Sequence, residues 1–354
     1  MEEKEFMEIT IEKPNKKIRQ EIKKVWDQIA KPLDGMGQFE DMIAQIGAVL
    51  GNSNPDIEKK ALIVLCADNG IVEEKISQSG QEVTKLLAYH MGKQETSVCK
   101  MAQHVHADVI PVDIGINTKE KIEGVLDQKI AEGTKNFLKE KAMTRQEVID
   151  AIETGIHLVR TYKEQGYHLI ATGELGMGNT TTSAAVSSVL LGKEISKMTG
   201  RGAGASDQAL LHKQKVIEEG IRKHHPDQND PIEILSCVGG LDIAGMTGIF
   251  IGGAMYHIPI VMDGVISVTA ALTAERLKKG VREYLIPSHM SREPAARLAL
   301  EELGIHPVID ASLALGEGTG AVMMFSLLDL AMALYKDHLT FEDVMLEQYT
   351  RCSL

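Results

Sequence analysis

The sequence has few aromatic residues and few cysteines. Phe, Trp and Tyr make up 4% of the 354 residues, which disfavours a surface that binds nucleic-acid bases by stacking. The cysteines are widely spaced and form no C-x-x-C pair: Cys66, Cys99, Cys237 and Cys352. This spacing favours free thiols in a reducing compartment over a disulfide framework or a zinc knuckle.

An excess of positive charge is also lacking, as is a long hydrophobic run. The formal net charge is -12, whereas proteins that bind nucleic-acid backbones carry a basic surface. The apolar run over 321–335 is interrupted by Asp329 and is too short to cross a bilayer, and the acidic N-terminus lacks the apolar segment of a signal peptide. We therefore expect a cytoplasmic protein with no nucleic-acid or membrane partner.

Short apolar runs alternate with amphipathic stretches along the chain. The runs are rich in β-branched residues, as in strands buried on both faces of a parallel sheet; they span 61–66, 107–113, 167–172 and 258–263. Helices are predicted over 144–166, with Gly166 as a C-terminal cap, and over 206–221, with Ser206 as the N-cap. The alternation predicts an α/β fold with a doubly wound, mainly parallel, Rossmann-like sheet.

The two ends of the chain are predicted to be helical. Helices are expected over 16–30 and 38–50 before the first strand, and over 319–336 and 341–350 at the end. We expect three segments, in which the first and last combine into a small helical domain beside the α/β domain: 1–55, 56–318 and 319–354. Residues 117–143 are polar and weakly periodic, which indicates an excursion from the fold or a lid.

Four predicted strands run into an acidic residue close to a glycine. Because ligands bind beyond the carboxyl ends of the strands in an open parallel sheet, these acids are expected at one rim: Asp68, Asp113, Glu174 and Asp263. One such acid alone is more often a cap of the following helix. Four of them beside a glycine-rich loop favour a site.

The segment ATGELGMGNTTTSAAV, residues 171–186, has the glycine spacing of a nucleotide-hydrolase phosphate loop but not its lysine. Asn179 and Thr180 follow Gly178, where that loop has Lys and then Ser or Thr. Without the lysine, chemistry on a triphosphate is not expected. The backbone N–H groups of 176–182 can still bind a phosphate at the start of a helix.

Two further glycine loops also precede helices. TGRGAGASD (199–207) contains Arg201 and is followed two turns later by Lys213, and LGEGTGAV (315–322) places Glu317 between two glycines. A fourth glycine-rich segment, GGLDIAGMTG (239–248), has helical flanks and is interpreted as close packing of small residues. No histidine has the spacing of a metal site, and no G-x-S-x-G nucleophile motif is present.

Taken together, these motifs resemble one family over nearly the whole chain. The matching stretches, in order, are ADNG (67–70), SGQEVT (79–84), VDIGI (112–116), GELGMGNTTTSAAV (173–186), GRGAG with SD (200–207), DG with IS (263–267), SH-S-EP (288–294) and LGEGTGA (315–321). They resemble the nicotinate-nucleotide–dimethylbenzimidazole phosphoribosyltransferase family. The resemblance implies transfer of phosphoribose from nicotinate mononucleotide to 5,6-dimethylbenzimidazole, with inversion at the anomeric carbon and without metal or cofactor. It also implies a homodimer with a Rossmann-like domain and a small helical domain.

The same resemblance implies roles for particular residues. Glu317 is expected to be the general base that accepts the imidazole proton, and Glu174 to hold the ribose hydroxyls or support charge on the sugar. The other expected substrate contacts are Ser77 and Gln81 near the base, Gly176, Gly178, Asn179, Thr180, Gly202, Gly204, Lys213 and Ser291 on the nucleotide and phosphate, and Asp263 and Leu315 at the rim and beside the base.

The sequence departs from the family pattern near the expected base pocket. Ser79, Gly80 and Lys85 stand where an aromatic residue, proline and glutamine are typical, which predicts a broader range of acceptor bases. Two alternatives remain at this point. One is a non-catalytic nucleotide-binding homologue, and the other is an ATP-dependent enzyme, against which the missing lysine argues.

Overall fold

A six-stranded parallel sheet forms the centre of the molecule. The computed structural model describes residues 2–202, 204 and 206–351, and Cys352 therefore lies outside the described residues. The strand order is β3-β2-β1-β4-β5-β6, and every neighbouring pair is parallel. The strands are β1 Lys60–Ala67, β2 Ala107–Gly115, β3 Leu126–Asp127, β4 Leu169–Leu175, β5 Ile260–Val261 and β6 Leu285–Ile286. This is the strand order of a Rossmann fold, in which the order in which strands are added to the sheet reverses between β1 and β4.

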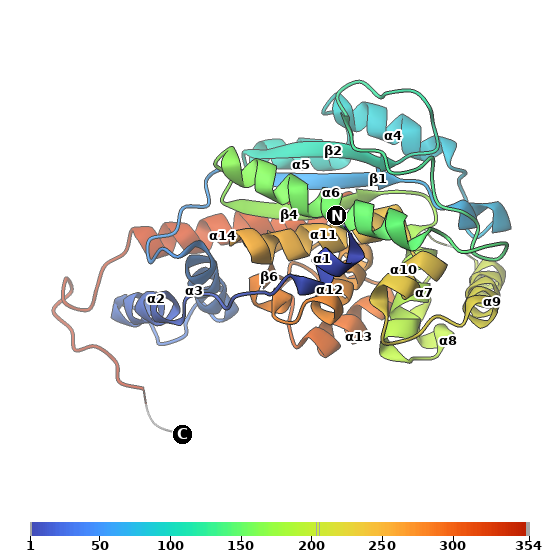
Figure 1. Ribbon diagram of the computed structural model, residues 1–354. Helices are drawn as coiled ribbons and strands as arrows, with labels where there is room; N and C mark the ends of the chain where they lie inside the picture. The colour runs from blue at the N-terminus through green and yellow to red at the C-terminus, as the bar shows by residue number, and fades with distance from the viewer. Residues whose placement is uncertain (1, 203, 205, 352–354) are drawn as a thin grey trace.

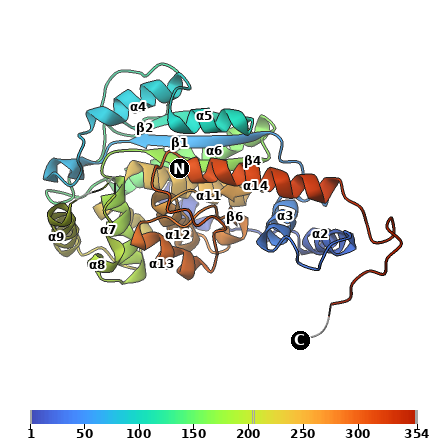
Figure 2. The ribbon, with the colours of Figure 1, turned by 180° about the vertical axis from the view of Figure 1, so that it is seen from behind.

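Helices cover both faces of the sheet (Figures 1 and 2). Alternate residues of β1 point to opposite faces. Ile63 and Leu65 belong to the core shared with α6, α7 and α10–α13, while Leu62 and Val64 belong to the core shared with α2–α5 and α14. The helices are α1 Glu3–Glu8, α2 Lys16–Gln28, α3 Gln38–Leu50, α4 Glu82–Gly92, α5 Ser97–His104, α6 Arg145–Glu164, α7 Asn179–Leu191, α8 Ile195–Met198, α9 Asp207–His224, α10 Pro231–Val238, α11 Leu241–Tyr256, α12 Val265–Leu277, α13 Pro294–Leu303 and α14 Thr319–Lys336, with 3₁₀ turns over Gly70–Glu74 and Val281–Tyr284.

The predicted doubly wound α/β fold is therefore confirmed. The four predicted strands correspond to β1, β2, β4 and β5, and the predicted caps are also present. Ser206 accepts a hydrogen bond from the Ala209 N–H at the start of α9, and Gly166 has a positive φ of 84° just after α6.

The packing interpretation of 239–248 agrees with the structure. The segment enters α11, which crosses α6 at very short range. A Cβ on Gly248 would collide with the Ile152 carbonyl oxygen, and one on Gly155 with the carbonyl oxygen of Gly245. Glycines on both helices thus allow the two backbones to approach each other.

Helices α2 and α3, near the start of the chain, lie beside α14, near its end, next to the α/β core (Figure 1). The rings of Trp26 in α2 and Tyr335 in α14 lie 5.3 Å apart, and α3 packs against α14. These contacts agree with the expectation that both ends contribute to one helical unit, although the division into domains remains a prediction. By length and composition α14 could cross a membrane; here its apolar side chains Val322, Phe325 and Leu328 are buried in the protein core.

The predicted helix over 341–350 is wrong. The chain makes turns through Met345 and then has no regular structure to residue 351. Asp343 accepts hydrogen bonds from the N–H and hydroxyl of Thr340, which closes one local turn. Met345, Leu346 and Tyr349 are exposed, so a helix here would lack the buried apolar face that stabilises short helices.

Residues 117–143 leave the sheet after β2, line its edge and then pass to α10, where the N–H groups of Ala142 and Met143 donate to the carbonyl oxygens of Cys237 and Ser236. They contribute β3, and the Lys129 amine donates to the Ile116 and Thr118 carbonyl oxygens and pairs with Asp113 at 3.0 Å. A structural role at the sheet edge thus accounts for this polar segment.

Candidate active site

Two adjoining cavities lie beyond the carboxyl ends of β4, β5 and β6. They share the loop between β4 and α7 and the loop that precedes α9. The larger cavity is lined by Glu174, Gly176, Asn179, Thr180, Gly202, Asp263, Ser291, Leu315 and Glu317, and by the previously unassigned Leu87, Leu175, Met177, Gly264, Val265, Ile266, Ser267, His289, Glu293, Leu313, Ala314 and Gly316. The smaller cavity is lined by Ile76, Ser77, Gln78, Gly176, Met177, Gly178, Asn179, Thr180, Arg201, Gly202 and Lys213.

The loop from β4 to α7 needs glycine for its shape. Gly178 has a φ of 88° at the N-cap of α7, a conformation that costs other residues energy. Gly176 lies so close to the Ala67 carbonyl oxygen of β1 that a Cβ would collide with it. The loop is thereby held against the switch point of the sheet, with the first N–H groups of α7 available to an anion.

Lys213, Thr180 and Gly202 form a cradle for an anion, which we call the phosphate cradle. Lys213 lies on α9 and is only 2% exposed, and its amine donates to the Thr180 hydroxyl at 2.8 Å. Burial lowers the pKa of Lys213 to about 8. Because charging a buried amine is costly without a partner, a bound phosphate would favour the protonated lysine.

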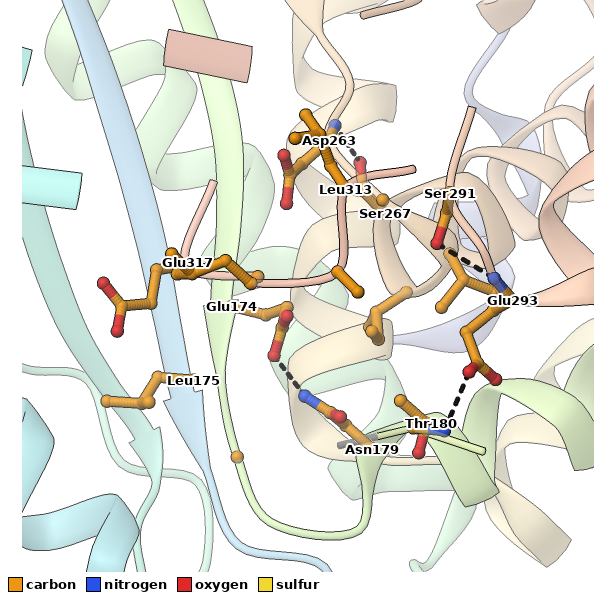
Figure 3. Close-up of a pocket in the computed structure, with 18 of the residues that line it drawn as sticks. Glu174, Leu175, Asn179, Thr180, Asp263, Ser267, Ser291, Glu293, Leu313 and Glu317 are labelled. Atoms are coloured by element: carbon orange, nitrogen blue, oxygen red, sulfur yellow. Dashed lines mark hydrogen bonds between the residues drawn. The ribbon is translucent and has the colours of Figure 1, made fainter. Parts of the chain in front are cut away.

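Glu174 lies at the end of β4, in the wall of the larger cavity. Burial raises its pKa well above the usual value, and the nearby carboxyl of Asp242 raises it further. The Asn179 side-chain amide donates a hydrogen bond to Glu174 (Figure 3). Asp242 is completely buried at the start of α11, and burial raises its pKa to about 7. These surroundings favour the protonated form of Glu174.

Glu317 lies between Gly316 and Gly318 in the loop before α14. Its φ of 60° is unusual for a residue other than glycine, and such conformations concentrate at functional sites. One carboxylate oxygen accepts a hydrogen bond from the Val98 N–H at 3.3 Å. Burial raises the pKa of Glu317, and this hydrogen bond offsets part of the rise. A raised pKa suits a carboxylate that removes a proton near neutral pH.

Asp263 anchors the start of α14 beside this loop. Its Oδ1 accepts hydrogen bonds from the N–H groups of Gly320 and Ala321, at 2.9 and 3.2 Å. The carboxylate thus satisfies N–H groups that a helix start leaves free. Asp263 holds the Glu317 loop in place while lining the cavity itself.

The larger cavity spans both sides of β4. Glu174 and Leu175 are consecutive strand residues and therefore point to opposite faces. In Figure 3 Glu317 lies on the side of Leu175, whereas Asn179, Thr180 and Glu293 lie on the side of Glu174. The side with Leu175 combines an apolar wall with the Glu317 carboxylate. The side with Glu174 is polar and adjoins the phosphate cradle.

Most of the residues expected at the site are brought together. Twelve of the fourteen line one cavity or both. Ser77 lies with Lys213 in the smaller cavity, away from Glu317. The two remaining residues, Gln81 and Gly204, are not among the described residues that line the two cavities. Gln81 donates to the Asn69 carbonyl oxygen, and the Gly204 carbonyl oxygen accepts from Gln78.

The rim of four acids forms only in part. Glu174 and Asp263 line the cavity, whereas Asp68 and Asp113 hold loops. Asp68 accepts from the Asn117 N–H and Asp113 from the Ile116 N–H. Capping and turn formation, the common role of such acids, accounts for these two.

Sequence reasoning missed several cavity residues. Leu87, Leu313, His289 and Glu293 line the larger cavity, and no glycine motif marks them. His289 and Glu293 fall within SH-S-EP, a stretch from which only Ser291 was singled out. Within residues 2–202, 204 and 206–351, no group of three His, Cys, Asp or Glu residues is arranged to hold a metal ion.

Comparisons with known proteins agree on one family. A family model described as phosphoribosyltransferase matches residues 11–345. The chain is similar to the nicotinate-nucleotide–dimethylbenzimidazole phosphoribosyltransferase of Acetivibrio thermocellus, with 44% identity over 91% of this chain and 92% of that protein. The protein of the same name from Geotalea uraniireducens is 39% identical over 90% of each chain. The crystal structure of CobT from Thermus thermophilus matches with a TM-score of 0.88 and 31% identity, over 94% of this chain and all of that one.

Proposed function

The chain belongs to the nicotinate-nucleotide–dimethylbenzimidazole phosphoribosyltransferase family, and on that premise we propose how its two cavities carry out the reaction. The enzyme transfers phosphoribose from nicotinate mononucleotide to 5,6-dimethylbenzimidazole or a related base, giving nicotinate and α-ribazole 5'-phosphate for the lower ligand of cobalamin. The observation that carries the proposal is the position of Glu317, a half-buried carboxylate in the same cavity as Gly202 and Thr180 of the phosphate cradle.

The phosphate cradle anchors the substrate. Its donors are the N–H groups at the start of α7 and at Gly202, with the Thr180 hydroxyl and the Lys213 ammonium beside them. A monophosphate needs no more than these contacts, because the leaving group here is a pyridine and no pyrophosphate charge has to be neutralised. This accounts for Asn179 in the place of a phosphate-loop lysine.

Glu317 receives the acceptor's proton. One imidazole nitrogen attacks C1' while the bond from C1' to the nicotinate nitrogen breaks, and the electron pair of that bond returns to the pyridine ring. The proton on the other imidazole nitrogen passes to the Glu317 carboxylate, a step usually worth about 10²–10⁴-fold in rate. Leu87, Leu175 and Leu315 supply apolar surface for the flat base on this side of β4.

Glu174 supports the sugar on the other side of β4. Its raised pKa favours a protonated carboxyl that can donate to a ribose hydroxyl. As positive charge develops on the sugar ring, the Asp263 carboxylate in the wall of the same cavity stabilises it electrostatically.

A turnover assay tests the function. The purified protein, given nicotinate mononucleotide and dimethylbenzimidazole, is expected to release nicotinate and form a ribotide detectable by mass. A failure to form product with any benzimidazole, purine or phenolic acceptor would refute the assignment. The non-catalytic alternative gains no support from the comparisons, since the similar curated proteins carry an enzyme's name.

We also propose that the protein is a cytoplasmic homodimer. The outer side of α14 and the C-terminal segment expose apolar side chains that a second copy would cover; Leu330 is 67% and Leu346 is 62% exposed. Buried apolar surface of this kind stabilises subunit association. Sedimentation of dilute protein at the mass of one chain would contradict this proposal.

A further inference from the structure

A carboxylate of the protein itself lies in the phosphate cradle. Glu293 is the N-cap residue of α13, and its Oε1 accepts the Gly202 N–H at 2.8 Å (Figure 3). The same carboxylate lies against Gly200, where a Cβ would collide with it. Glu293 therefore already occupies one of the donors that the proposed function assigns to the substrate's phosphate.

The negative charge of Glu293 also acts on Lys213 of the phosphate cradle. Burial lowers the pKa of Lys213, and the Glu293 carboxylate acts against that shift. The lysine amine donates to Thr180 and, at 3.5 Å, to the Gly200 carbonyl oxygen. The carboxylate thus partly fills the electrostatic role of a bound anion.

The backbone holds Glu293 in this position. The Ser291 hydroxyl accepts the Glu293 N–H at 3.3 Å, and Pro294 follows as the first residue of α13. Proline restricts the conformation of the residue before it to extended values; Glu293 has φ −70° and ψ 127°. The side chain is presented toward the cradle by a short, constrained segment.

We propose that Glu293 is a specificity-determining residue that competes with free anions for the phosphate cradle and yields only to the phosphoribosyl substrate. This inference rests on the proposed function, since it takes the cradle to be the phosphate site. A tethered carboxylate competes at a high effective concentration, so a weakly bound free anion cannot displace it. Nicotinate mononucleotide displaces it because its ribose and pyridine also bind in the larger cavity.

The direction of the effect separates this role from an ordinary substrate contact. A residue that binds substrate weakens binding when it is removed, whereas a competitor strengthens it. Losing one charge-assisted hydrogen bond to an internal competitor is expected to tighten binding of inorganic phosphate about tenfold. Carboxylates such as acetate are expected to gain affinity as well.

The test is calorimetric titration of the full-length protein with inorganic phosphate and with acetate. Glu293→Gln removes the charge, and Glu293→Ala empties the position; both are expected to bind phosphate about tenfold more tightly than the parent. Glu301→Gln removes an equal charge from an exposed position on the same helix and is expected to leave the affinity unchanged. Glu293→Asp, the mildest change, provides a folded comparison if the larger changes disturb the loop, and it is expected to bind phosphate more tightly than the parent.

Unchanged or weaker phosphate binding in the Glu293 variants would overturn the proposal. The titration needs no turnover, so its outcome is separate from that of the proposed function. If the protein transfers no phosphoribose but binds phosphate more tightly after Glu293→Gln, the proposed function is refuted and the competitor role of Glu293 is supported. An active enzyme whose phosphate affinity is the same with and without the Glu293 carboxylate would support the proposed function and refute the competitor role of Glu293.

Discussion

Binding of the substrate's phosphate is expected to weaken above pH 8 because of one buried lysine. Lys213 is 2% exposed, and burial lowers its pKa to about 8. If only the protonated lysine binds phosphate, the apparent Kd equals the intrinsic Kd divided by the protonated fraction. That fraction falls from about 0.9 at pH 7 to about 0.1 at pH 9, a roughly tenfold loss, or about 1.4 kcal/mol. A lysine with its ordinary pKa would lose only about 3% over the same range.

The measurement is the Kd of nicotinate mononucleotide by calorimetry from pH 7 to pH 9.5. This range lies above the second phosphate pKa of about 6, so the ligand stays a dianion. Lys213→Arg is the matched control, because guanidinium remains charged throughout, and its Kd is expected to stay flat whatever its absolute value. A parent Kd that is equally flat to pH 9.5 would refute the assignment of Lys213 to the cradle.

Three further predictions follow from close contacts and from the acceptor side. Gly173→Ala places a Cβ 2.6 Å from the Glu317 carbonyl oxygen, so a shift approaching 1 Å in the base is expected to lower kcat about 10²-fold; a kcat equal to that of the parent would contradict this. Gly248→Ala forces α6 and α11 apart and is expected to cost at least about 1–3 kcal/mol of unfolding free energy in urea, whereas an unchanged midpoint would show that the crossing adapts. In competition among equimolar dimethylbenzimidazole, benzimidazole, 5-methoxybenzimidazole and adenine, ribotides of the other bases are expected alongside that of dimethylbenzimidazole, and a preference above about a hundredfold over all three would refute a broad acceptor range.

The structure changes the basis of the last of these predictions. Lys85, one of the three departures from the family pattern, pairs with Glu120 at 2.6 Å on the surface. It is therefore held away from a polar edge of the acceptor. The apolar residues proposed to contact the base in the larger cavity are instead Leu87, Leu175 and Leu315, and a tolerant apolar wall discriminates weakly between bases of similar size.

The sequence predicted the elements that carry their own local signal. Continuous apolar runs marked four strands, and glycine loops marked the starts of α7 and α14. β3 and β6 were missed, since each has two residues and no run of its own. The helix over 341–350 was predicted from local pattern, but of its apolar residues only Phe341 is buried, and tertiary packing decides such cases.

Site residues that stand in a sequence motif could be predicted. Site residues that reach the cavity only because distant segments of the chain meet in the fold could not. Gly178 and Glu317 stand in motifs that can be recognised from the sequence. Glu293 reaches the Gly202 N–H from 91 residues away, and His289 approaches Asp263 at 3.8 Å from a different strand end. These contacts arise only because β4, β5 and β6 are neighbours in the sheet, an order that no local pattern specifies.

The measurement that tests the account most directly is the turnover number of Glu317→Gln at saturating nicotinate mononucleotide and dimethylbenzimidazole. Glutamine keeps the shape of the side chain and removes its ability to accept a proton. The account predicts that kcat falls about 10²–10⁴-fold while the Kd of nicotinate mononucleotide stays within about twofold of the parent. A variant whose kcat remains within about threefold of the parent would contradict the assignment of Glu317 as the base.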